Sequence, residues 1–304
     1  MGRENMGKAA GNKEVKRGGV PQPGILAPLP PLGRYLFFSV TPGGDPRTGI
    51  KALAVAADGV STVVGAGLSL LQALGRSVPG LRVFPAMHGA GFDVPSTQDA
   101  LWIWLRGDDR GELMHRTHTL EKILGTAFRL DHVVDAFKHD DGRDLTGYED
   151  GTENPVGEDA VAAACTDDGG SFVAVQQWVH DFPAFHALPR SEQDDAIGRR
   201  RDDNEELDDA PESAHVKRTA QESFSPEAFI LRRSMPWTEG RSGGLLFVAF
   251  GHTLDAFEVQ MRRMAGLEDG IVDALFRFSR PVSGGYYWCP PVVKGRLDFA
   301  FPEG

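Results

Sequence analysis

Leu101-Trp102-Ile103-Trp104-Leu105 is the strongest strand signal in the chain, because large apolar residues stand there in an unbroken run. Apolar residues then recur at helical spacing across residues 109–124, and residues 128–137 return to a strand pattern. Strand, helix and strand therefore follow one another. This order is typical of an α+β unit in which a helix covers one face of a sheet.

The same alternation continues on both sides of this run. Upstream, the pattern predicts strands at residues 35–40 and 61–65 and helices at residues 45–58 and 68–74. Downstream, it predicts strands at residues 171–179, 228–232 and 245–250 and helices at residues 252–264 and 269–278. The sequence thus predicts two related α+β halves, joined near residues 155–168, where Gly, Asp and Ala dominate.

The domain organisation follows from this reading. Residues 1–31 are predicted to be a flexible tail, disordered as far as residue 19 and then proline-rich and extended against the body. Residues 32–158 and residues 159–304 are the predicted N-terminal and C-terminal domains. The polar stretch at residues 198–215 holds Arg199-Arg200-Arg201 and then seven acidic residues, and it is predicted to be a solvated loop or a functional one.

Composition excludes several classes of function. The formal net charge is −11, which disfavours general binding to nucleic acid or to anionic membranes. Cys165 and Cys289 form no C-x-x-C pair, so we expect two reduced thiols. No apolar run approaches the roughly 20 residues of a membrane span. No export signal is recognisable, so we expect a cytoplasmic protein.

A glycine-bracketed carboxylate is the first candidate for chemistry. Gly147-Tyr148-Glu149-Asp150-Gly151 would present Asp150 from a tight turn, and Thr152-Glu153-Asn154-Pro155 continues it without any strand or helix pattern. Without further support, a surface Asp-Gly turn explains the glycines equally well. The added polar residues favour a functional site.

Two further segments carry candidate residues. Among nine histidines, His115 and His118 stand three apart on a predicted helix and could share a metal ion, but no carboxylate pattern reinforces them. His215 follows the acidic stretch and could be structural or a ligand. In Leu231-Arg232-Arg233-Ser234-Met235-Pro236 a strand runs into two arginines, which are either solvated or turned inward toward an anion.

Taken together, these segments resemble the dye-decolourising peroxidases, and most closely their B-type branch. The G-x-x-D-G motif matches residues 147–151, a haem-ligating histidine matches His215, and a distal arginine matches Arg232. Residues 276–287 and 21–26 also look like the family. The order and spacing of the motifs carry the resemblance, which covers nearly all of the chain beyond residue 20.

The resemblance implies two ferredoxin-like α+β halves with antiparallel sheets flanked by helices, and haem b held mainly by the C-terminal half. His215 would be the axial ligand of the iron, with Asp273 as the acceptor of its other ring nitrogen. Arg199 resembles the arginine that pairs with a haem propionate. Gly151, Thr152 and Glu153 are assigned to the surroundings of the haem, with the carboxylates of Glu149 and Glu153 structural or facing solvent.

On the opposite face, the resemblance implies that Asp150 moves a proton of hydrogen peroxide and that Arg232 stabilises the developing charge. Ser234 would hold a distal water. Arg233 directly follows the distal arginine, so a shift of one residue would exchange their roles; the family spacing favours Arg232. Which of Asp150 and Arg232 dominates is left open.

The expected activity is peroxide reduction through a ferryl intermediate, with oxidation of dyes, phenolics or other one-electron donors. Core packing is the favoured role for the candidate electron relays Trp178, Trp237, Tyr286, Tyr287 and Trp288. Relatives commonly form homo-oligomers, and we expect no nanocompartment-targeting tail. The alternatives are a haem-handling protein that stores haem or releases its iron, and a haem-free binding module.

Overall fold

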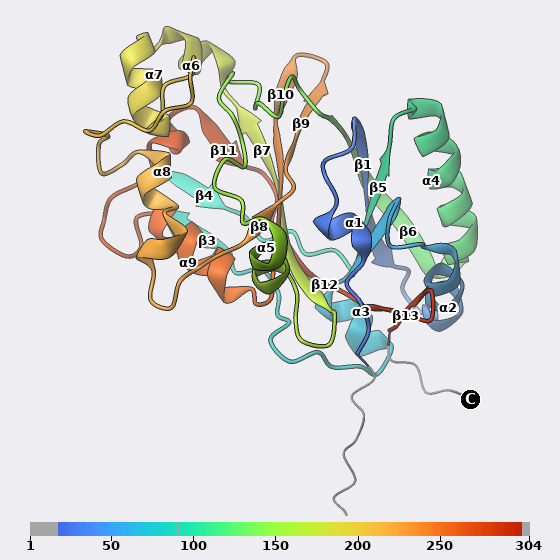
Figure 1. Cartoon of the computed structure of the whole chain (residues 1–304). Helices are drawn as coiled ribbons and strands as arrows, with labels where there is room; N and C mark the ends of the chain where they lie inside the picture. Colours follow the sequence, from blue (N-terminus) through green and yellow to red (C-terminus); the bar gives the residue numbers. More distant parts are fainter. Residues whose placement is uncertain (1–17, 90, 300–304) are drawn as a thin grey trace, which may run out of the picture.

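The fold is α+β, as the sequence predicts. The computed structural model describes residues 18–89 and 91–299. Figure 1 shows two groups of strands near the middle of the molecule, with α2 (Arg47–Ala56) and α4 (Arg110–Leu124) outside one group and α8 (His215–Arg218) and α9 (Asp255–Met264) outside the other. Helices therefore lie on the outer faces of the strands.

The first half holds the elements upstream of residue 138. Its strands are β1 (Leu32–Val40), β2 (Thr62–Ala66), the hairpin β3 (Met87–Gly89) and β4 (Phe92–Val94), β5 (Leu101–Gly107) and β6 (Phe128–Phe137). Its other helices are α1 (Pro23–Leu26), α3 (Leu68–Ala73) and the 3-10 turn η1 (Gly125–Ala127).

The second half holds the remaining elements. Its strands are β7 (Ser171–His180), β8 (Leu231–Arg232), β9 (Met235–Glu239), β10 (Ser242–Gly251), β11 (Ser279–Pro281), β12 (Gly285–Cys289), β13 (Val292–Val293) and β14 (Arg296–Leu297). Its other helices are α5 (Gly157–Ala164), α6 (Phe182–Ala187), α7 (Arg190–Ile197) and the 3-10 turns η2 (Gln221–Ser223) and η3 (Ala274–Arg277).

Strand order shows that the two halves are built alike. The four principal strands of the first half have the antiparallel order β6-β1-β5-β2, and those of the second half have the order β12-β7-β10-β9, so in each half the fourth strand is followed by the first, third and second. This is the ferredoxin-like arrangement. The halves join edge to edge at the pairs Ala136↔Trp237 and Trp288↔Ala66, so the strands close on themselves. Each junction is a single residue pair, so closure gives every one of these edge strands a neighbour at one point.

The sheet has two buried faces, which explains the unbroken apolar run of β5. Trp102 and Trp104 point inward to a core enclosed by the closed strands, together with Tyr35 and Phe250. Leu101, Ile103 and Leu105 belong to the other core, under the helices. A strand that is buried on both faces shows no alternation of apolar and polar residues.

Helix α4 begins and ends where its sequence dictates. The Asp109 side chain accepts a hydrogen bond from the Glu112 backbone N–H, which caps the first turn. At the other end Gly125 adopts a φ of 64°, a left-handed conformation that glycine tolerates and that stops the helix.

Two predicted elements are wrong. The helix expected at residues 269–278 is reduced to η3, because Gly270 has a φ of 81° and the Asp273 side chain caps a new turn at Leu275. The strand expected at residues 228–232 is limited to Leu231–Arg232. The joining segment at residues 155–168, to which the sequence assigned no element, contains α5, since its alanines favour a helix once one face is buried.

The N-terminal segment is packed where it can be described. The expected disorder of residues 1–19 falls mostly outside the described residues. From Gly18 onward the chain lies on the body and is not a flexible tail there: Gln22 and Ile25 are fully buried. The Gln22 side chain bonds both Val64 backbone groups and the Pro290 carbonyl oxygen. Pro23 begins the short helix α1, in place of an extended chain.

The partly buried carboxyl of Asp99 should make the stability of the fold depend on pH. Asp99 accepts a hydrogen bond from the Tyr287 hydroxyl at 3.3 Å, and burial raises the pKa of Asp99 from 3.8 to about 6. Between these values the folded state binds more protons than the unfolded state, so stability falls as the pH rises. We expect the wild-type unfolding free energy to drop through this window relative to that of Asp99→Asn, which cannot ionise. Denaturant unfolding at several pH values measures it, and a difference independent of pH would contradict it.

Among the helices of the described residues, none is both long and apolar enough to cross a bilayer.

Candidate active site

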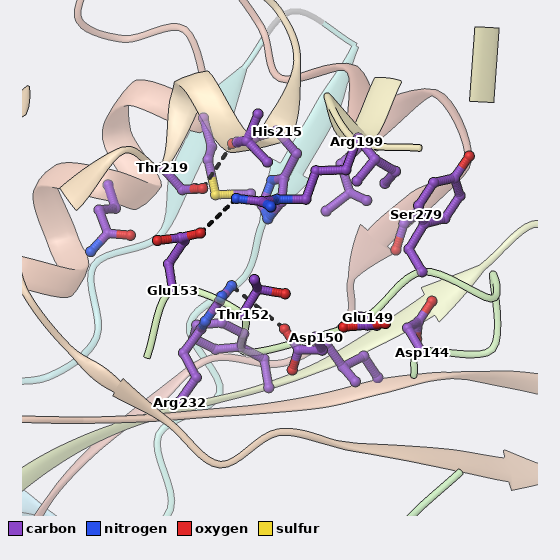
Figure 2. A pocket seen from close by; sticks show the side chains of 18 of the residues that line it. Asp144, Glu149, Asp150, Thr152, Glu153, Arg199, His215, Thr219, Arg232 and Ser279 are labelled. Carbon is purple, nitrogen blue, oxygen red and sulfur yellow. Dashed lines mark hydrogen bonds and ion pairs between the residues drawn. The ribbon is translucent and has the colours of Figure 1, made fainter. Parts of the chain in front are cut away.

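One pocket brings most of the predicted site residues together. It lies between the outer face of the second half's strands and the helices α8 and α9, and it encloses about 1450 Å³ of empty space, part of it open to solvent. Its apolar wall includes Phe247, Phe257, Met261, Met264 and Leu275. Figure 2 shows His215 on one side of the pocket and Arg232 with Asp150 on the other.

His215 occupies the first position of α8 and is held by a buried carboxylate. Its Nδ1 lies 2.8 Å from Asp273 Oδ2, and the Asp273 side chain is fully buried. The other Asp273 oxygen accepts the Leu275 backbone N–H. We assign the Nδ1 proton from this partner, which leaves the Nε2 lone pair free. The His215 side chain is 22% exposed and lines the pocket.

Asp150 and Arg232 form a pair on the opposite wall. Arg232 Nη1 lies 3.5 Å from Asp150 Oδ1, and both side chains are largely buried. Asn154 fastens their segments to each other: its Oδ1 accepts the Arg232 backbone N–H at 2.7 Å, and its Nδ2 donates to the Arg232 carbonyl oxygen at 3.1 Å. Asn154 therefore positions both members of the pair, and the sequence assigned it no such role.

The bracketing glycines are required by geometry. Gly147 has a φ of 90°, and a Cβ there would lie 2.9 Å from Arg201 Cδ. Gly151 has a φ of 79°, and a Cβ there would lie 2.7 Å from Asn154 Nδ2. A side chain at either position would strain the backbone and displace a neighbour. Gly151 thus shapes the loop and is not among the lining residues of the pocket.

Arg199 lies at the pocket and is paired with acids. Its Nη2 bonds Glu153 at 2.6 Å and Glu206 at 3.0 Å, and its Nη1 donates to the Asn204 carbonyl oxygen. The side chain is 12% exposed, whereas that of Glu153 is 63% exposed. The polar stretch at residues 198–215 is therefore folded over the pocket by its own charges. Thr152 joins it, since its hydroxyl accepts from Asn204 Nδ2.

Ser234, like Gly151 and Asp273, is a predicted site residue that does not line the pocket. Its side chain is 4% exposed, and its Oγ accepts the Val248 backbone N–H at 3.3 Å. It lines a small separate cavity that Asp150 also borders. Residues of a strand alternate between faces, but the chain here leaves β8 before β9 begins, so spacing from Arg232 does not fix the side that Ser234 faces.

Arg233 points away from the pocket. Its guanidinium donates to the carbonyl oxygens of Ile25 at 3.0 Å and Leu26 at 2.9 Å. It thereby anchors α1. Of the two adjacent arginines, only Arg232 lines the pocket.

Residues outside every predicted motif also line the pocket. Asp144, His180 and Ser279 form a hydrogen-bonded chain on one wall. Gln176 is 1% exposed, and its Nε2 has no hydrogen-bond partner, although its Oε1 accepts from Trp178 Nε1. The alternating pattern of β7 could have indicated that Gln176, Trp178 and His180 share a face. It could not have shown what they face.

The other candidates lie elsewhere. His115 and His118 are both exposed on α4, and residues 18–89 and 91–299 contain no group of three or more His, Cys, Asp or Glu able to hold a metal ion. All five aromatic residues considered as electron relays are less than 10% exposed: Trp178, Trp237, Tyr286, Tyr287 and Trp288. Core packing accounts for this burial.

Comparisons with known proteins agree with this site. A family model described as "Dyp-type peroxidase, C-terminal" matches residues 141–294. A dye-decolorizing peroxidase of Mycolicibacterium paratuberculosis is 32% identical over 90% of this chain and 84% of its own length. The crystal structure of DyPB from Rhodococcus jostii has a TM-score of 0.82 and 27% identity, and it covers 90% of this chain and 96% of that one.

A weaker likeness bears on the alternative function. A deferrochelatase of Escherichia coli is 28% identical over only 57% of this chain and 48% of its own length. The region that the Dyp-type family model matches, residues 141–294, includes the GxxDG loop with Asp150, together with His215 and Arg232. Asp150, His215 and Arg232 meet in the pocket. The dye-decolorizing peroxidase that is 32% identical covers 90% of this chain, and the family model matches about half of it, so the chain belongs to the Dyp-type peroxidase family.

Proposed function

We propose that this peroxidase uses haem b to reduce hydrogen peroxide and to oxidise dyes, phenolics or other one-electron donors. The observation that carries the proposal is the facing arrangement of two pairs across one apolar pocket. His215 with Asp273 forms one wall, and Asp150 with Arg232 forms the other. A reaction that polarises and splits a small oxidant between a metal and acid–base groups needs both walls.

The residues present fit a haem. Of the two histidines that line the pocket, His180 has both ring nitrogens hydrogen-bonded, whereas His215 has only Nδ1 bonded, to the buried Asp273 carboxylate, and so offers Nε2 within a largely apolar wall. One strong axial ligand and an open opposite position are what a haem peroxidase requires. The unpartnered Gln176 Nε2 and the shielded Arg199 offer donors to the polar edge of such a group. When bound, haem would supply the electron-transfer chemistry.

On the proximal side, His215 would ligate the iron through Nε2. Asp273 accepts the hydrogen bond from His215 Nδ1–H. This bond fixes the orientation of the ring and increases the electron donation of the imidazole. The second oxygen of Asp273 is bound to the backbone of η3, so the carboxylate cannot rotate freely.

On the opposite wall, Asp150 would accept a proton from one oxygen of hydrogen peroxide and return it to the other oxygen, which leaves as water. Arg232 lies beside this carboxylate and would stabilise the negative charge that develops as the O–O bond breaks. Asn154 keeps the two side chains in register. Ser234 we place behind Asp150, as a support for a water molecule.

Several finer assignments rest on the resemblance and the sequence. We assign the chain to the B-type branch, to the cytoplasm and to a homo-oligomeric state. Beyond residue 31 we divide the chain into two domains that meet at residues 158 and 159. We assign Arg199, Thr152 and Glu153 to the edge of the haem. There Arg199 would exchange its ion pairs with Glu153 and Glu206 for one with a haem propionate.

The alternative is a haem-handling protein, and one experiment separates the two. The haem-loaded protein is mixed with hydrogen peroxide and a phenolic donor, and the oxidised donor, protoporphyrin and free iron are all measured. We expect catalytic donor oxidation with the porphyrin iron retained. Stoichiometric release of iron without turnover of the donor would favour haem handling, and protein that takes up no haem would exclude both.

A further inference from the structure

A hydrogen-bonded chain of three side chains borders the pocket and has no part in the steps above. Asp144 Oδ1 lies 3.0 Å from His180 Nε2, and His180 Nδ1 lies 2.7 Å from Ser279 Oγ. The three come from a loop, the end of β7 and the start of β11. The register of β11 on β7 pairs Ser279 directly with His180. All three line the same pocket as Asp150.

The side chains of this hydrogen-bonded chain are largely buried although two of them are titratable. The side chain of His180 is 4% exposed and that of Asp144 is 14% exposed. Burial alone would raise the pKa of Asp144, but hydrogen bonds from His180 and Thr146 outweigh it and hold the pKa below its ordinary value. Thr146 donates both its backbone N–H and its hydroxyl to Asp144 Oδ2. Asp144 is therefore an ionised acceptor that keeps a proton on His180 Nε2.

Ser279 can then face the pocket in two ways. When His180 is neutral, Nδ1 carries no proton and accepts the Ser279 hydroxyl, so a serine lone pair is free for a donor in the pocket. When His180 is protonated, Nδ1–H donates to Ser279 and the hydroxyl proton is free to turn outward. One proton passed along the chain converts the first state into the second. The arrangement is a relay with Asp144 as its fixed end.

We propose that Ser279, His180 and Asp144 form a proton-accepting subsite for the hydroxyl of a phenolic reducing substrate. The proposal rests on the proposed peroxidase function and names where one class of donor binds. The phenol O–H donates to Ser279 Oγ. Trp178, Ile197 and Leu275 supply the apolar surroundings for its ring among the pocket residues.

The step balances in protons and electrons. The enzyme that peroxide has oxidised takes one electron from the phenol. The phenol O–H bond breaks, its proton goes to Ser279 Oγ, and the proton of Ser279 goes to His180 Nδ1. The product leaves as a neutral phenoxyl radical, and Asp144 stabilises the imidazolium until the proton is released. Two such oxidations return the two protons and two electrons that reduction of one peroxide to water consumes.

The charges on this wall favour a neutral donor over an anionic one. Asp144 is ionised, and Glu149 and Asp150 border the same pocket. A carboxylate placed against Ser279 would meet these acids, whereas a phenol brings only a hydrogen-bond donor. His180 is faced by Asp144 from the loop, by Ser279 from β11 and by the edge of the Phe182 ring at the start of α6.

The test compares two donors in the haem-loaded protein. Guaiacol loses a proton with its electron, whereas ferrocyanide does not. In Ser279→Ala we expect the ratio of the guaiacol rate constant to the ferrocyanide rate constant to fall about tenfold or more, as loss of a proton acceptor implies. The solvent deuterium isotope effect on the guaiacol step should shrink toward unity. Calorimetry should show weaker guaiacol binding to the resting protein, by about fivefold for one lost hydrogen bond.

Two further variants make the result specific. Ser279→Thr keeps the hydroxyl and should restore the ratio. Ser283→Ala removes a hydroxyl that accepts the Gln177 backbone N–H outside the pocket, and it should behave as the wild type. An equal loss with both donors, or a Thr variant no better than Ala, would overturn the subsite. If the wild-type protein itself failed to react with peroxide, the proposed function would fail instead.

Discussion

His215→Ala is expected to abolish axial ligation by the protein and to lower kcat/KM for peroxide by about a thousandfold or more, which is about 4 kcal/mol of transition-state stabilisation. The reason is that His215 Nε2 is the imidazole nitrogen left free in the pocket, while Nδ1 is committed to Asp273. Alanine leaves the buried Asp273 carboxylate without its side-chain partner as well. The absorption spectrum of the ferric protein and steady-state kinetics measure the effect.

His118→Ala is the matched control. It removes an imidazole that is exposed on α4, far in the fold from the pocket lining, so spectrum and kinetics should match those of the wild type. Circular dichroism of both variants checks that the fold persists. An unchanged ferric spectrum in folded His215→Ala would rule out the proximal assignment.

Asp150→Asn and Arg232→Ala are expected to slow the first spectral change after mixing with peroxide. Loss of a positioned proton acceptor costs about 10²–10⁴ in rate, and loss of a donor that stabilises developing charge costs about 10²–10³. Because the two side chains lie 3.5 Å apart and share one substrate, we expect their effects to be coupled. The double variant should therefore be faster than the product of the two single effects implies. Stopped-flow absorbance at several peroxide concentrations gives the three rate constants.

The neighbouring arginine provides the control for Arg232. Arg233→Lys retains a positive charge near the Ile25 and Leu26 carbonyl oxygens and alters nothing in the pocket lining, so the peroxide step should keep its rate. A slow Arg233 variant beside a fast Arg232 variant would show that the two roles are exchanged. If both Asp150→Asn and Arg232→Ala reacted at the wild-type rate, the distal wall would need another explanation.

The peroxide and phenol experiments are independent of each other. Variants of Asp150 and Arg232 should change the reaction with peroxide whatever the donor. Variants of Ser279 should change the donor step according to the donor. This separation follows from the pocket, which the Asp150–Arg232 pair and the chain of Asp144, His180 and Ser279 line as two separately bonded groups.

Much of the fold could be predicted because apolar periodicity is a local signal. Strand β6 (Phe128–Phe137) has the predicted bounds, and α4 differs from them by a single residue, since Asp109 caps it and Gly125 ends it. Prediction failed where apolar residues have helical spacing but a glycine or a capping side chain interrupts the helix. Residues 269–278 have helical spacing, but Gly270 and the capping carboxylate of Asp273 break the helix into a short 3-10 turn.

The sequence by itself determined which residues face each other across the pocket: His215 on one wall, and Asp150 with Arg232 on the other. Glycines at 147 and 151 present Asp150 because only glycine adopts their backbone angles without strain, and His215 and Arg232 stand in segments whose order matches the family. Tertiary structure alone decided that Asn154 joins the two distal residues, that Arg233 turns away, and that His180 meets both Asp144, 36 residues before it, and Ser279, 99 residues after it. Such contacts depend on strand register and sheet closure, which involve residues far apart in the chain, and no pattern within a short window of sequence encodes them.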